Sequence, residues 1–153
     1  PITRLPVRLK LQLIDALLNY EKDTSTCALP VRKLHPLSTQ LAEPISKNYR
    51  IQIEALLLIN LLAFGSDVFI YSPFPVLQCI DSGNEIDYDQ KKIIEVYGVY
   101  KKWFNRIKSS GGKGFTFPDI NSVGVKWFGL GESSRNYQTA GGWSTNFNCI
   151  EIE

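Results

Sequence analysis

His35 is the residue with the most obvious chemical potential, because it is the only histidine in the chain. A histidine can serve as a general base beside a serine or cysteine nucleophile, and it is also a common metal ligand. No nucleophile motif accompanies it: the run Gly-Glu-Ser-Ser-Arg that begins at Gly131 lacks the closing glycine of the G-x-S-x-G motif. A surface or capping histidine is therefore the better interpretation. A small hydrolase that pairs His35 with a cysteine or a carboxylate is the alternative function.

The three cysteines, Cys27, Cys79 and Cys149, could form one disulfide and leave one free thiol, or all three could stay reduced. They are widely spaced and form no C-x-x-C pair, which excludes a zinc ribbon and a thioredoxin-like redox motif. Because cysteine prefers buried positions, three reduced and mostly buried thiols are the better interpretation. We expect neither a metal site nor a cofactor.

Two polar segments match known ligand-binding loops only in part. The segment 109–114 has the glycines and lysine of a phosphate loop, but the G-x-x-x-x-G-K-[ST] spacing fails and Phe115 replaces the serine or threonine. The second is the acidic segment 81–89. Counted from Asp81, the sixth and twelfth positions hold Ile86 and Lys92, where a calcium-binding EF-hand loop needs glycine and glutamate. We therefore interpret the first as an inter-element loop and the second as a turn followed by a helix cap.

The last part of the chain mixes large aromatic side chains with glycine, serine and asparagine. Such mixtures are typical of binding loops, where rigid rings supply contact area and small polar residues supply hydrogen bonds. Aromatic residues and arginine are also enriched among the residues that dominate binding energies. We therefore expect four anchors for a partner protein: Trp127, Arg135, Tyr137 and Trp143. The rings could instead complete a small core, and Trp127 or Trp143 could stack on a carbohydrate or another small ligand.

These features make a non-catalytic protein-binding module, of inhibitor or immunity type, the leading functional hypothesis. The net charge of +2 is too small to indicate a nucleic-acid partner. The longest apolar run, residues 55–64, spans ten residues and is broken by Asn60, whereas a membrane helix needs about 20. We therefore expect no transmembrane segment. The compartment stays open, because the chain could be cytoplasmic or could be exported with a signal peptide removed before residue 1.

The elements that must position these residues are mainly helical. We expect one domain over residues 1–153, with a helical scaffold over about 1–108 and a glycine-, serine- and aromatic-rich segment over about 109–153. Apolar spacing predicts at least three packed helices with a small β or irregular C-terminal element, so the fold class is mainly α, with α+β as the variant. Within each predicted element, apolar residues recur at regular intervals. The predicted helices cover 5–22, 44–64 and 87–108, and the strand candidates cover 123–128 and 146–152.

Finer features mark the ends and faces of these elements. Gly65 is expected to cap the second helix, and Asp87 with Gln90 to form a capping box for the third. The second half of the second helix is apolar nearly all round, which predicts the centre of the core. The segment 67–80 is either a hairpin or a loop. The third helix carries an apolar stripe that should face the core: Ile93, Val96, Tyr97, Tyr100, Trp103, Phe104 and Ile107.

Overall fold

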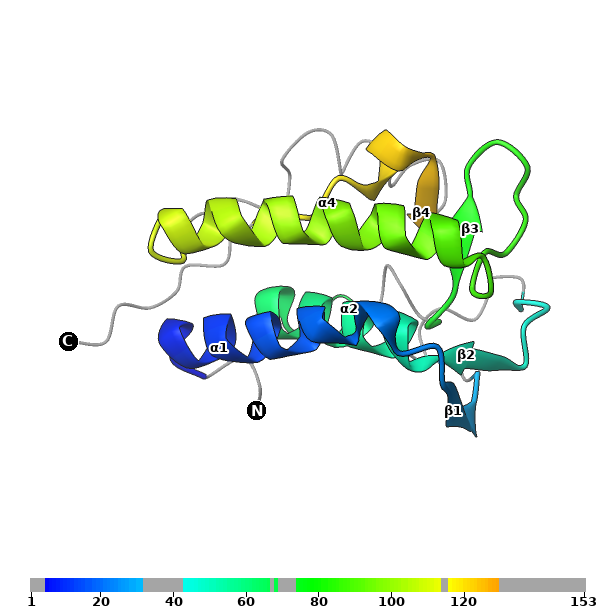
Figure 1. Cartoon of the computed structure of the whole chain (residues 1–153), viewed down its shortest axis with the longest axis horizontal. Coiled ribbons are helices and arrows are strands. Elements are labelled where there is room, and N and C mark those ends of the chain that lie inside the picture. The colour runs from blue at the N-terminus through cyan, green and yellow to red at the C-terminus, as the bar shows by residue number, and fades with distance from the viewer. Residues whose placement is uncertain (1–4, 32–42, 67, 69–73, 114–115, 130–153) are drawn as a thin grey trace.

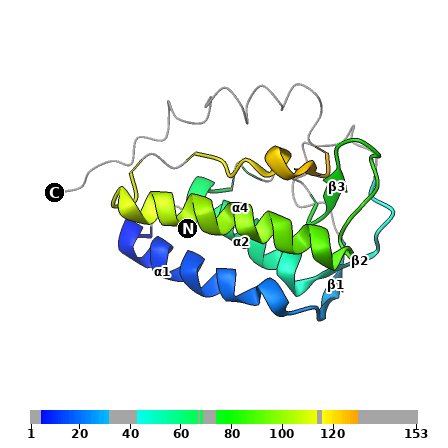
Figure 2. The same ribbon diagram turned by 45° about the horizontal axis from the view of Figure 1, so that its top comes forward.

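In the computed structural model, the described part of the chain forms three α-helices and two small antiparallel sheets (Figure 1). This confirms the mainly α class with some α+β character. The structure describes residues 5–31, 43–66, 68, 74–113 and 116–129. Helix α1 runs opposite to α2 and α4, and the segment 116–129 runs back along α4 on the side away from α1 (Figure 2).

Helix α1 (Val7–Leu18) continues into the short 3-10 helix η2 (Asn19–Lys22), which confirms the first predicted helix. Pro6 precedes the first turn and provides no side-chain cap. A proline fits this place because its missing N–H would have no helical partner there. Ile14 and Leu18 are buried, and they pack α1 against the other two helices. Val7, Leu9, Leu11 and Leu13 alternate with polar residues, a pattern that also fits a strand, and the structure places all four in the helix.

Helix α2 (Ile51–Phe64) is the centre of the core, as its apolar sequence predicts. Most of its side chains are buried, and Gly65 ends it with a φ of 77° and an N–H that donates to the Leu61 carbonyl at 2.8 Å. The predicted start near residue 44 is wrong. Residues 48–50 form a strand, and the backbone N–H groups of Ile45 and Ser46 donate to the Glu85 carboxylate at 2.5 and 2.7 Å. These distant partners take the backbone out of the helical conformation.

Helix α4 (Gln90–Ser109) buries its whole predicted apolar stripe. The predicted cap is wrong by two residues. Asp89 is the N-cap, and its carboxylate accepts the Lys92 N–H at 3.1 Å. Asp87, two residues before this cap, is 1% exposed, and its Oδ1 accepts the Leu77 N–H at 2.7 Å. Both aspartates fit a capping motif locally, and the strand beside them decides which one caps the helix.

Two short sheets lie at the end of the molecule where α4 begins (Figure 1). Strand β1 (Thr26–Pro30) pairs with β2 (Asn48–Arg50), with Thr26 opposite Arg50. Strand β3 (Leu77–Cys79) pairs with β4 (Val125–Trp127), with Leu77 opposite Trp127. The strand predicted over 123–128 is therefore confirmed, and its partner is β3. The strand predicted over 146–152 lies outside the described residues, as does most of the segment 67–73 that precedes β3.

The core contains a few polar side chains that link the helices. Gln52 is fully buried; its side-chain Nε2 donates to the Glu21 backbone carbonyl, and its backbone carbonyl accepts the Tyr97 hydroxyl at 2.9 Å. Asn60 is also fully buried, and its Oδ1 accepts the Tyr100 hydroxyl at 2.8 Å. Because buried polar groups are costly without partners, these bonds hold α2 and α4 in one relative position.

Candidate binding surface

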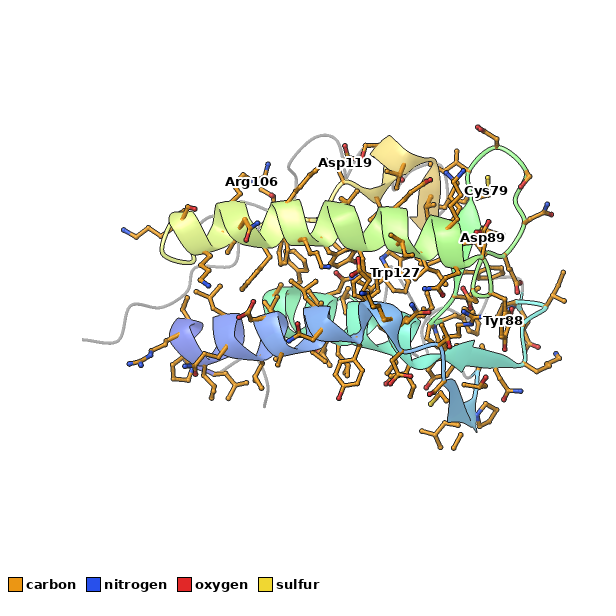
Figure 3. All side chains as sticks on the ribbon, viewed as in Figure 1. Cys79, Tyr88, Asp89, Arg106, Asp119 and Trp127 are labelled. Carbon is orange, nitrogen blue, oxygen red and sulfur yellow. The ribbon has the colours of Figure 1, made fainter. Side chains whose placement is uncertain are left out.

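The four predicted anchors do not lie on one described surface. Trp127 is fully buried and lies between the helices, at the end of β4 (Figure 3). Its position agrees with the alternative interpretation, in which a ring completes the core. Arg135, Tyr137 and Trp143 lie outside the described residues, and so do His35 and Cys149. Cys27 and Cys79 are free thiols.

Helix α1 carries apolar residues on two opposite faces. One face holds Ile14 and Leu18 and is buried against the core. The opposite face, here called the outer α1 face, is exposed and consists of Leu9, Leu13 and Ala16 of α1 with Tyr20 of η2, which continues it. Leu9, Leu13 and Tyr20 are 39%, 38% and 43% exposed. At 3.6 residues per turn, Leu9 and Leu18 point about half a turn apart, so the two faces cannot be covered by the same neighbour.

The spacing of the outer α1 face is that of a helix-packing stripe. Its residues follow one another at intervals of four, three and four, which places them in one row along the helix. Exposed single leucines are ordinary, but a continuous apolar row on one helix is a feature of surfaces that bind other proteins. Figure 3 shows side chains that project from α1 both toward α4 and away from it.

A cavity of about 370 Å³, here called the α1–α4 groove, lies beside this face, where α1 begins and α4 ends. Apolar lining comes from Val7, Leu11 and Phe104. Gly111 lines the groove and is followed by Gly112. Their φ values are positive, at 67° for Gly111 and 80° for Gly112. A side chain at Gly112 would collide with Val7. The predicted inter-element loop thus turns tightly against α1, and only glycine allows this close approach.

The charged residues of the groove are Arg8, Asp15 and Lys108. Within the described part of the chain, none of the three forms an ion pair. The Lys108 ammonium lies 5.8 Å from the centre of the Phe104 ring, which is a cation–π distance. Farther along α4, Lys101 pairs with Glu21 of η2 at 2.7 Å. An ion pair thus links η2 to α4, whereas the groove carries two cations and one carboxylate that form no ion pair among the described residues.

A second polar region lies where β3 meets the start of α4. Burial raises the pKa of Asp87 to about 8 against the opposing hydrogen bond from the Leu77 N–H, and the charge of Glu85 raises it further. Its Oδ2 has no hydrogen-bond partner among the described residues. Nearby, the backbone N–H and hydroxyl of Ser82, together with the Asp81 N–H, lower the pKa of the half-exposed Cys79 thiol. The same hydrogen bonds stabilise the charged form of this thiol relative to a free cysteine, and the chain's histidine lies outside the described residues.

The sequence carries a signal for the outer α1 face. Val7, Leu9, Leu11 and Leu13 alternate with polar residues. On a helix, alternate residues fall on opposite sides, so the pattern itself implies two apolar faces. The groove had no comparable signal, because it is made by residues about one hundred positions apart in the sequence.

The chain has no match among protein-family models, curated proteins or solved structures. Over the described residues, the helices are all too short or too polar to cross a membrane.

Proposed function

We propose that this chain is a non-catalytic protein-binding module. The observation that supports this function is the outer α1 face, an apolar row that stays exposed on a helix whose other face is buried. Burial of apolar side chains is the main favourable term in most protein association, and aromatic residues such as Tyr20 contribute strongly to it. An inhibitor or immunity role would use such a surface directly, because it requires tight binding and no chemistry.

The predicted tail anchors lie outside the described residues, so the proposal treats them separately from the outer α1 face. Arg135, Tyr137 and Trp143 would add contacts of their own, and the outer α1 face would add contacts from the helical scaffold. A partner that uses both surfaces should lose affinity when either is changed. A partner that uses one surface should respond to only one set of variants.

The test is affinity capture with the tagged chain in an extract of its source cells, read by quantitative mass spectrometry. Leu9→Gln/Leu13→Gln removes the apolar row and keeps helix-compatible side chains. Tyr137→Ala/Trp143→Ala changes the tail, and Gln12→Ala is the matched control on α1. Thermal unfolding must show that each variant folds before its capture is compared.

We expect at least one stoichiometric partner that the parent chain and Gln12→Ala retain, and that Leu9→Gln/Leu13→Gln reduces about tenfold or more. A partner lost only from the tail variant would keep the binding function and contradict the role of the outer α1 face. The absence of any saturable partner would contradict the function itself.

A second candidate, the small hydrolase, has one supporting observation. The lowered pKa of the Cys79 thiol is a property of nucleophilic cysteines. A catalytic cysteine also needs a base, and His35 is the histidine that the sequence offers. Hydrolysis of activated esters that both Cys79→Ala and His35→Ala abolish would favour this candidate over the binding function.

A further inference from the structure

We propose that the α1–α4 groove is a binding site for a carboxylate attached to an apolar chain, as in a medium-chain fatty acid. This site is separate from the outer α1 face, so it does not depend on the function proposed above. Ligand-binding cavities are commonly about 300 Å³ or larger, mostly apolar, and supplied with a few polar groups that orient the ligand. The groove has this composition, at about 370 Å³.

The charge of the ligand follows from the two cations among the residues that line the groove. Arg8 extends from α1 and Lys108 from α4, and both line the same cavity. Two like charges on facing helices repel each other, and within the described residues no carboxylate pairs with either of them. An anion bound between them would remove this repulsion and would accept hydrogen bonds from both side chains. A cationic ligand of the same shape would be repelled.

The apolar part of the ligand follows from Val7, Leu11 and Phe104. Phe104 is 3% exposed, and Val7 and Leu11 are half-buried, so the groove offers apolar side chains directly beside the cations. A free phosphate or sulfate would use only the charges and would leave this apolar surface in contact with water. A ligand with an alkyl chain covers it.

Asp15 sets the length of that chain. It lines the groove seven residues after Arg8, which corresponds to about 10 Å along the helix. An alkyl chain of roughly eight carbons spans this distance with the carboxylate at Arg8 and Lys108 and the methyl end short of Asp15. A second anionic group at the Asp15 end would be unfavourable, so the groove selects one carboxylate and one direction of binding.

Octanoate is the probe for the test, and binding is followed by ¹H–¹⁵N chemical-shift titration of the full chain. Octyltrimethylammonium carries the same chain with the opposite charge, and acetate carries the carboxylate without the chain. Arg8→Gln/Lys108→Gln removes the two groove cations. Lys10→Gln/Lys102→Gln is the matched control, because it removes the same charge from the same two helices at residues that do not line the groove.

We expect saturable octanoate binding with a dissociation constant on the order of 1 mM, and shifts centred on Val7, Leu11 and Phe104. Arg8→Gln/Lys108→Gln should weaken it roughly tenfold, while the control pair changes it less than twofold. Asp15→Asn should tighten it by up to about twofold. The proposal would be overturned if octyltrimethylammonium bound as tightly as octanoate, or if the control pair lost as much octanoate affinity as Arg8→Gln/Lys108→Gln. Chemical-shift changes centred on the outer α1 face, or binding that does not saturate, would overturn it as well. If the double variant unfolds, Arg8→Gln alone takes its place in the titration and should also weaken octanoate binding.

Discussion

Helices α1 and α2 are both rich in leucine, yet they use it differently. In α2 most apolar side chains are buried and the others are half-buried, on all sides of the helix. In α1 only one face is buried, and Leu9 and Leu13 stay more than a third exposed. Apolar composition alone therefore does not show which residues stabilise the fold. The difference suggests that the leucines of α2 contribute to stability, whereas the outer leucines of α1 are available for binding.

The largest expected effect is a truncation in α2. Leu56 is fully buried and belongs to the main core cluster. Leu56→Ala should cost about 3 kcal/mol of unfolding free energy, because it removes buried apolar area and leaves a cavity. Chemical denaturation of the parent and variant chains measures this directly. A cost below about 1 kcal/mol would mean that α2 is not the centre of the core.

The second prediction concerns Asp87, a buried carboxyl group beside α4. The folded chain holds a proton on Asp87 up to about pH 8, while the same carboxyl has an ordinary pKa of 3.8 in the unfolded chain. Since the folded state binds the proton more tightly, stability should fall as the pH rises between these two values. Asp87→Asn cannot titrate, so its stability relative to the parent should rise steadily from pH 5 to about pH 8, by up to about 1.4 kcal/mol per pH unit, and level off above that.

Denaturant midpoints of both chains between pH 5 and pH 9 test this effect. The matched control is Asp89→Asn, the same substitution at the exposed cap of α4, where asparagine caps as well as aspartate. We expect its stability relative to the parent to stay constant over this range. A constant difference for Asp87→Asn as well would show that the carboxyl of Asp87 is ionised in the folded chain.

The smallest expected effect concerns the outer α1 face and completes the comparison. Leu13→Ala is the same substitution as Leu56→Ala, but it removes a side chain that is 38% exposed. Its cost should stay within about 0.5 kcal/mol, which is usual for surface positions. Denaturation at several protein concentrations gives the value. A cost near that of Leu56→Ala would show that the outer face is covered, for instance by a second copy of the chain.

The best sequence predictions rest on strong local patterns. The stripe from Ile93 to Ile107 repeats at helical spacing over about four turns, and all of it is buried. Gly65 ends α2 because only glycine readily adopts its positive φ. The start of α2 could not be predicted in this way. Glu85 binds the backbone at residues 45 and 46, and no local pattern reveals a partner that is forty residues away.

Site predictions depended even more on distant residues. The aromatic character of Trp127 was visible in the sequence, but its burial follows from the pairing of β4 with β3. Asp87 and Asp89 offer the same carboxylate two residues apart, and only the position of Leu77 makes one of them a buried acid. The groove cations were visible as single residues, and only the antiparallel packing of α1 and α4 brings them to one cavity.

The sequence by itself determined that this chain is mainly helical and which helix faces are apolar, because helix periodicity and glycine stereochemistry act over a few neighbouring residues. The tertiary structure decided which of those faces are buried, which aspartate holds a proton, and which cations share a groove. These outcomes depend on the free energy of contacts between residues far apart in the chain, where burial changes the environment of each side chain.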